Sequence, residues 1–214
     1  MAEACKTQLQ NQVLVEGKND CHVLLALFKH YQLPQNFGIY ECGSDDNAIR
    51  RMNALIPTTE PDQTIALILD GDNPSRYAKW QQISDKLTKA GYSLPSDFPE
   101  EGLWLNENDK PNIAIWLMPD NTQDGMLEDF CHAMIDQQTV LPFIESHIDN
   151  AKQQGFTSFK EVHKSKAIVH AYLALQDEPG MPLGQAITAK HLNPDSPIAK
   201  KLVAFLQKVF VRND

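Results

Sequence analysis

The chain has 214 residues, 42% of them hydrophobic, which is enough for one domain of ordinary size with a real core. No apolar run approaches the roughly 18 consecutive residues that a membrane helix needs, and the first residues lack the charged-then-apolar pattern of an export signal. The composition therefore argues against membrane-spanning helices and a membrane partner, and we expect a cytoplasmic protein.

The four cysteines form no C-x-x-C pair and do not have the spacing of a zinc finger; they are Cys5, Cys21, Cys42 and Cys131. We therefore expect free thiols, as in a reducing compartment.

The net charge of -9 is unevenly distributed along the chain. Residues 1–150 carry 10 basic and 23 acidic side chains, whereas residues 151–214 carry 9 and 5. A basic C-terminal segment beside an acidic body can let phosphates dock on one side and meet cations on the other. A solvated surface dotted with lysines explains the same composition, so both interpretations stay open.

Apolar runs and amphipathic stretches alternate in the first half of the chain, which is typical of βαβ units. Strands are predicted at residues 12–16, 37–42, 64–69 and 113–118, and residues 102–105 can form a hairpin with the last of these. Helices are predicted at residues 19–30, 45–55 and 75–90, the second with Ser44 or Asp45 as its N-cap.

Beyond Pro119 the chain is predicted to be helical at residues 125–137, 140–154, 159–176 and 197–210, with a loop at residues 178–184. We therefore expect an α/β domain over residues 1–137, with a parallel sheet of about four strands flanked by helices. A helical C-terminal segment over residues 138–214 is expected to pack on it.

Two of the predicted strands stop abruptly at acidic residues. Val13-Leu14-Val15 is followed by Glu16, with Asp20 one helical turn later, and Ile68-Leu69 is followed by Asp70-Gly71-Asp72. Carboxylates at the carboxyl ends of two strands of one open α/β sheet can converge on one crevice. Because they repel one another there, they favour a hard cation such as Mg²⁺ between them. Asp20 is also placed to cap the helix that follows, so a structural role for it stays open.

The order of these pieces resembles the Toprim domain shared by topoisomerases, bacterial primases, recombination-mediator proteins, small ribosomal-RNA maturases and overcoming-lysogenization-defect nucleases. The matching text is Leu14-Val15-Glu16-Gly17-Lys18-Asn19-Asp20 and Ile68-Leu69-Asp70-Gly71-Asp72, within about the first 120 residues. The resemblance implies a Toprim, Rossmann-like sheet. It also implies that Glu16 is a metal ligand or acid-base group and that Asp70 and Asp72 are Mg²⁺ ligands.

A third acidic string follows the last predicted strand. Gly125-Met126-Leu127-Glu128-Asp129 resembles a segment of small stand-alone Toprim-like proteins of uncharacterised function, and in place it parallels the second-metal acid of the overcoming-lysogenization-defect nucleases. Those nucleases use a downstream lysine to stabilise charge on the phosphate. The resemblance implies Glu128 as a metal ligand and Lys166 as that lysine, with Lys164 as an alternative. Glu128 also fits an exposed helix acid, and Lys166 a lysine that snorkels from an apolar stripe.

The leading hypothesis is a Mg²⁺- or Mn²⁺-dependent, Toprim-type phosphodiester-processing enzyme, a nuclease with DNA or RNA as partner. One or two ions would be held by five acids, and Lys166 would stabilise the scissile phosphate; the acids are Glu16, Asp20, Asp70, Asp72 and Glu128. The alternative is a non-catalytic Toprim-like module that binds metal or nucleic acid. A haloacid-dehalogenase-type phosphatase is disfavoured, because its Asp-x-Asp ends the first strand and precedes Gly-Thr, whereas Asn73-Pro74 follow here.

Overall fold

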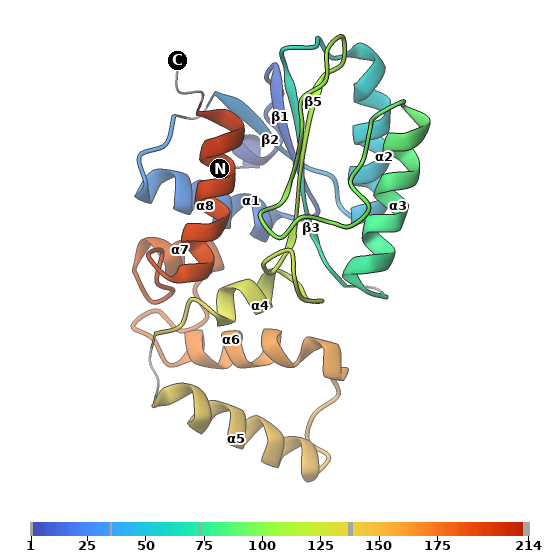
Figure 1. Cartoon of the computed structure of the whole chain (residues 1–214). Coiled ribbons are helices and arrows are strands. Elements are labelled where there is room, and N and C mark those ends of the chain that lie inside the picture. The colour runs from blue at the N-terminus through green and yellow to red at the C-terminus, as the bar shows by residue number, and fades with distance from the viewer. Residues whose placement is uncertain (1, 35, 73, 137–138, 212–214) are drawn as a thin grey trace.

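A five-stranded sheet forms the centre of the computed structural model, which describes residues 2–34, 36–72, 74–136 and 139–211 (Figure 1). The strand order is β2-β1-β3-β5-β4. The strands are β1 (Asn11–Val15), β2 (Phe37–Glu41), β3 (Thr64–Asp70), β4 (Leu103–Leu105) and β5 (Asn112–Met118). All neighbours are parallel except β4, which runs antiparallel to β5 as the predicted hairpin. The expected α/β class with a mostly parallel sheet is confirmed, with five strands instead of about four.

Helices cover the sheet and extend beyond one end of it. They are α1 (Lys18–His30), α2 (Asp45–Leu55), α3 (Arg76–Lys89), α4 (Leu127–His132), α5 (Val140–Gln153), α6 (Lys164–Ala174), α7 (Leu183–Thr188) and α8 (Pro197–Phe210). Three short 3-10 helices complete the elements, η1 (Ala2–Cys5), η2 (Ile56–Thr58) and η3 (Glu161–His163).

Two helix predictions and one loop prediction need correction. The helix expected at residues 125–137 is only α4, because the chain turns after His132 and the carbonyl of Met134 accepts the N–H of Asn193. The helix expected at residues 159–176 is divided into η3 and α6, and α7 begins inside the predicted loop. For α4 the boundary coincides with a contact to a distant segment, which a local periodicity does not report.

The sheet is buried on both faces because helices cover both of them. Successive side chains of each strand point to opposite sides and so enter two different apolar layers. Leu67 and Leu69 belong to the apolar layer under α2 and α3, whereas Ile68 belongs to the layer under α1 and α8. Figure 1 shows these helices on the two sides of the sheet. On the second side, the rings of Trp116 in β5 and Phe205 in α8 lie 5.4 Å apart between centroids. This packing fixes the strand ends that carry the acids.

Helices α5 and α6, together called the helical arm below, lie beyond the carboxyl ends of the parallel strands (Figure 1). Helix α6 contacts α4, and α5 contacts α6. The arm therefore stands over the end of the sheet where the acidic residues were expected. No helix within the described ranges is both long and apolar enough to cross a membrane.

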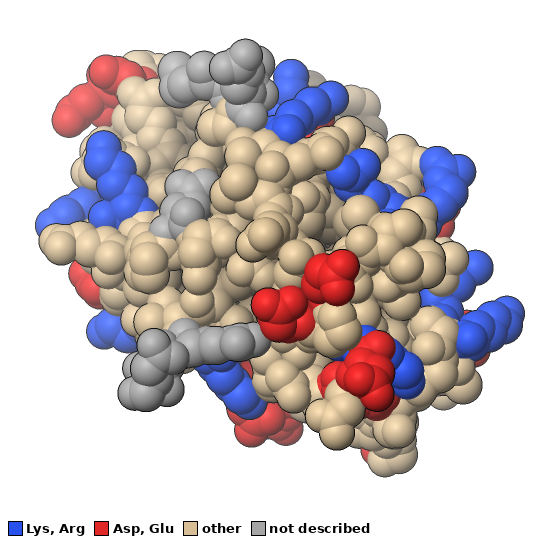
Figure 2. Space-filling view, turned by 90° about the horizontal axis from the view of Figure 1, so that it is seen from above, with Lys and Arg blue, Asp and Glu red and all other residues tan. Residues whose placement is uncertain are grey.

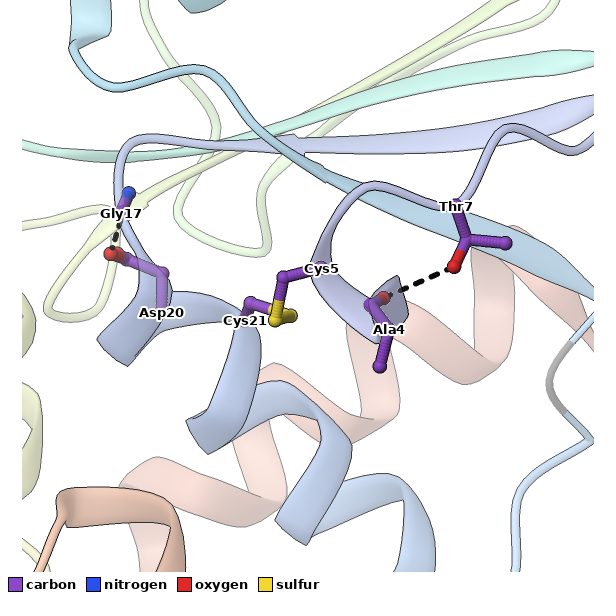
Figure 3. The surroundings of a disulfide bond; sticks show 6 residues. All are labelled: Ala4, Cys5, Thr7, Gly17, Asp20 and Cys21. Carbon is purple, nitrogen blue, oxygen red and sulfur yellow. Dashed lines mark hydrogen bonds between the residues drawn. A yellow bond between two sulfur atoms is a disulfide. The ribbon is translucent and has the colours of Figure 1, made fainter. Parts of the chain in front are cut away.

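A disulfide joins Cys5 to Cys21 and ties η1 to the first turn of α1 (Figure 3). The segment before β1 runs beside β2, where the N–H of Thr7 donates to the carbonyl of Ile39, and this route brings Cys5 over α1. The expectation of free thiols is therefore wrong for this pair, although it is confirmed for Cys42 and Cys131. The disulfide removes the cysteine-based reason for expecting a reducing compartment.

Candidate functional site

Glu16 and Asp70 are held together at the ends of the neighbouring strands β1 and β3. The main-chain N–H of Asp70 donates to Glu16 Oε1 at 2.9 Å, and the N–H of Leu127 donates to Asp70 Oδ1 at 2.8 Å. Each carboxylate is thus oriented by the main chain of another segment. This arrangement fixes both acids before any ligand arrives, as a preorganised site requires.

The turn after β3 depends on glycine at position 71. A Cβ atom there would lie 2.5 Å from the carbonyl oxygen of Met118, at the end of β5. Instead the N–H of Gly71 donates to that oxygen at 3.1 Å. Only glycine allows this close approach of two main chains. The turn then brings Asp72 to the side of the site that faces α2 and α3, where it lines the same hollow as Asp45.

Asp20 serves the start of α1 and also faces the site. Its side chain is buried, and Oδ2 accepts the N–H of Gly17 at 3.1 Å (Figure 3). This bond caps the first turn of the helix. Because Asp20 lines the same hollow as Glu16 and Asp70, its capping role and its place among the site acids coexist.

Glu128 and Lys166 meet across the gap between α4 and α6. Glu128 is buried, and its Oε1 lies 2.7 Å from the ammonium of Lys166, whose side chain is half exposed. Lys164 instead points to α5, where its ammonium lies 2.6 Å from Asp149. Of the two lysines that the sequence left open, the structure brings Lys166 to the acids and keeps Lys164 away from them.

A second contact runs beside this ion pair. The hydroxyl of Ser165 donates to Asp129 Oδ1, while Asp129 Oδ2 accepts the N–H of Met126 at 2.8 Å. Two adjacent residues of α4 thus bind two adjacent residues of α6. Asp129 caps α4 and fastens the helical arm, which gives it a structural role.

The acids line two adjacent hollows that share four side chains, those of Glu16, Asp70, Glu128 and Lys166. The α1-side hollow, of about 530 Å³, is completed by Gly17, Lys18, Asn19, Asp20, Glu41, Gly43 and Leu127. The α6-side hollow, of about 550 Å³, is completed by Asp45, Asp72, Pro74, Met126, Lys160, Val162 and His163. All six site residues predicted from the sequence therefore lie on one continuous concave surface.

Asp45 and Lys79 belong to this site, although the sequence analysis gave them no function. The carboxylate of Asp45 pairs with the ammonium of Lys79, whose side chain is buried. Ser44 is the N-cap of α2, which leaves Asp45 for this ion pair. The sequence could have pointed to Lys79, because this lysine is next to Trp80 and four residues before Ile83. Both of these apolar residues are buried. A lysine on an apolar helix face needs an anionic partner.

Burial, together with the repulsion between neighbouring acids, raises the pKa values of four carboxyl groups of the site, those of Glu16, Asp20, Asp70 and Asp72. Burial raises the pKa of Glu16 to about 7 and the pKa of Asp20 to about 6. Burial, and then the charges of Glu16 and Asp20, raise the pKa of Asp70 to about 9. Burial also raises the pKa of Asp72. The site therefore retains protons near neutral pH, and a bound cation can replace them.

In the described part of the chain, no three His, Cys, Asp or Glu side chains are placed so that they could hold a metal ion. Their oxygens have other partners: Glu16 and Asp70 accept main-chain N–H groups, and Glu128 accepts Lys166. The donor set fits a hard divalent cation by its chemistry, since carboxylate oxygens are the ligands that Mg²⁺ takes. Ligation by Glu128 would require it to exchange Lys166 for the ion.

Figure 2 views the molecule from the end of the sheet opposite the helical arm. Over the described residues visible on this face, Lys and Arg side chains are scattered near the outline and do not gather in one patch. Charge therefore gives no reason to place an anionic ligand there.

Comparisons with known proteins place the chain in a family. Among solved structures, the C-terminal region of the Burkholderia pseudomallei OLD protein matches with 11% sequence identity and a TM-score of 0.44, over 95% of this chain and 99% of that chain. No curated protein matches. The family described as "Protein of unknown function (DUF3226)" matches residues 10–211, which is nearly the whole chain. The chain therefore belongs to the DUF3226 family.

Proposed function

We propose that the protein is a Mg²⁺-dependent, Toprim-type phosphodiester-processing enzyme, a nuclease acting on DNA or RNA. The observation that carries this proposal is the convergence of acids from three segments, Glu16, Asp70 and Glu128, with Lys166 on one concave surface. Phosphodiester cleavage needs both a place for cations and a positive group beside the phosphate. The order of the acidic motifs in the sequence supports the same conclusion.

One or two Mg²⁺ or Mn²⁺ ions, when bound, would supply charge neutralisation at the phosphate and lower the pKa of a bound water. The residues that would hold them are Glu16, Asp20, Asp70, Asp72 and Glu128.

The chain's own groups supply two further contributions. Glu16, held at the end of β1 by the N–H of Asp70, is placed to accept a proton from an attacking water. Lys166 would exchange Glu128 for a non-bridging oxygen of the phosphate and stabilise its growing negative charge. Its half-exposed side chain has the freedom for this exchange.

The test is cleavage of labelled single- and double-stranded DNA and RNA by purified protein in Mg²⁺, in Mn²⁺ and in a chelator. We expect cleavage that needs the cation and is lost in the double variant Asp70→Asn, Asp72→Asn. Asp85→Asn, at an exposed acid of α3, is the matched control and should leave activity unchanged. Cleavage that persists in the double variant would overturn the assignment.

The closed ion pair between Glu128 and Lys166 favours a second candidate, a non-catalytic module that binds metal or nucleic acid. The cleavage assay, combined with calorimetric titration with Mg²⁺ or Mn²⁺ and with oligonucleotide binding, separates the two functions. A module would bind an oligonucleotide and never release a product, whereas an enzyme would bind the cation and turn the oligonucleotide over.

A further inference from the structure

The two hollows differ in what lines them beyond the four side chains that they share. The α1-side hollow adds mainly polar groups, such as Lys18 and Glu41. The α6-side hollow adds carbon surface from Pro74 and Val162, together with the imidazole of His163. Both hollows are lined mainly by polar groups, and the α6-side hollow in addition places Pro74 and Val162 beside the ring of His163.

Val162 and His163 stand side by side on η3 and are both exposed, Val162 to 52%. An apolar side chain and an aromatic ring on the wall of an open hollow offer a flat organic group two surfaces to pack against. The hollow measures about 550 Å³, within the range of roughly 300–1,000 Å³ that small-molecule sites occupy. It therefore has room for one nucleoside.

Unpaired cations flank the acids on both sides. Lys160 lies on the α6-side hollow and Lys18 on the α1-side hollow, and neither forms an ion pair with a residue in the described ranges. Lys164, only four residues from Lys160, is by contrast bound to Asp149. Two free ammonium groups on opposite sides of the centre suit a ligand that carries more than one phosphate along its length.

We propose that the α6-side hollow is a nucleobase subsite, which takes the base next to the scissile phosphate. In this arrangement the base packs on His163 and Val162, Lys160 neutralises the following phosphate, and Lys18 binds the strand on the other side. The substrate is then a phosphodiester inside a strand, with an unpaired nucleotide on the α6 side. This proposal rests on the proposed function and adds to it the form in which the substrate is bound.

The nucleotide must be unpaired because a base inside a duplex has both of its faces covered by its neighbours. Bases that stack on protein rings are presented from single strands, loops or ends. Such stacking depends weakly on base identity, so we expect cleavage with little sequence preference. The same stacking chemistry applies to DNA and RNA, and cleavage assays with oligonucleotides of both kinds distinguish these two substrates.

The test is a scan with single-stranded oligonucleotides in which one base at a time is replaced by an abasic residue. At the subsite position, the missing base should lower kcat/KM of the unaltered protein by about 5- to 100-fold, the effect of one stacked base. His163→Ala should cause a similar loss on the intact oligonucleotide. The two losses should not multiply when they are combined, because both remove the same contact.

Matched controls separate this contact from general effects. Lys160→Ala should weaken binding of a fluorescent oligonucleotide in anisotropy measurements without added cation, whereas Lys164→Ala, on the far side of the same segment, should not. His147→Ala, at an exposed histidine of α5, controls for His163→Ala.

Three outcomes would overturn the proposal. Losses that multiply at every abasic position would show that His163 does not contact a base. Equal cleavage of a single strand and of the blunt duplex of the same sequence would show that no base needs to be unpaired. A protein that cuts no oligonucleotide in Mg²⁺ or Mn²⁺ would overturn the proposed function as well, whereas the first two outcomes leave that function standing.

Discussion

The end of the sheet and the helical arm build the same site by different means. At the sheet, Glu16 and Asp70 follow strands that are buried on both faces, and main-chain N–H groups orient both side chains. In the arm, α5 buries only Ile144 among its described side chains, and Phe143 is 58% exposed. The arm reaches the acids through long side chains, above all Lys166.

This difference separates a rigid part of the site from an adaptable one. Side chains placed by a packed sheet have one position, which suits groups that must stay a fixed distance apart. A lysine on a helix at the edge of the molecule can change partners at small cost, because its stem is flexible and half exposed. We therefore expect substitutions at the sheet to abolish function and substitutions in the arm to weaken it.

The largest effect is expected for Glu16→Gln. This change keeps the hydrogen bond from Asp70 geometrically possible but removes the negative charge and the proton acceptor. Loss of a general base typically costs about 10²–10⁴ in rate, so we expect kcat to fall by about a thousandfold. Single-turnover cleavage in Mg²⁺ measures it, with Asp85→Asn, at an exposed acid of α3 that lines neither hollow, as the control. A loss smaller than that of Lys166→Met would reverse the comparison.

In the arm, Lys166→Met should lower kcat by about a hundredfold, the effect of losing one group that stabilises transition-state charge. Lys166→Arg should restore part of the activity, because it keeps the charge. Lys164→Met should change kcat less than twofold, since its ammonium is bound to Asp149. Equal losses for the two lysines would contradict the assignment that the geometry favours.

Removing the disulfide between Cys5 and Cys21 measures how much this bond contributes to holding the start of α1. Cys5 and Cys21 are 16 residues apart, and closing a loop of about this length stabilises a fold by roughly 3 kcal/mol. We expect the variant Cys5→Ala, Cys21→Ala to lose about 2–4 kcal/mol of unfolding free energy in urea without reductant. The control Cys42→Ala removes a free thiol and should lose much less. If reductant lowers the stability of the double variant as much as that of the unaltered protein, the bond is not the cause.

The smallest effect concerns pH. The pKa of Asp70 is raised to about 9 by burial and by neighbouring acids, from an ordinary value of 3.8. Between these values the folded protein keeps a proton that the unfolded chain releases, so stability in the absence of cations falls as the pH rises. Asp70→Asn removes this dependence and should raise the unfolding free energy by about 1–3 kcal/mol at pH 8, with no gain at pH 4. Denaturation in a chelator measures it, and parallel profiles for the two proteins would contradict it.

The sheet and its acids could be predicted because each depends on short stretches of sequence. An apolar run such as residues 64–69 predicts a buried strand, and an acid directly after it must lie at the strand end. The choice between Lys164 and Lys166 could not be predicted, since it depends on how α6 is rotated against α4.

The disulfide and the Lys79–Asp45 pair could not be predicted for a related reason. Each joins segments whose proximity follows from the three-dimensional path of the chain and not from its local pattern. For Cys5 that path is the return of the first residues along β2.

The pairing of Asp129 with Ser165 has a consequence for how sequences of this family vary. The Ser165 hydroxyl and the Asp129 carboxylate lie next to the contact between Glu128 and Lys166. They fasten α6 to α4 without lining either hollow. A chain that replaces one of the two should replace the other as well, because a lone, half-buried partner would lose this hydrogen bond. Coupled variation at positions 129 and 165, with Glu128 and Lys166 unchanged, would mark the family members that retain this attachment of the arm.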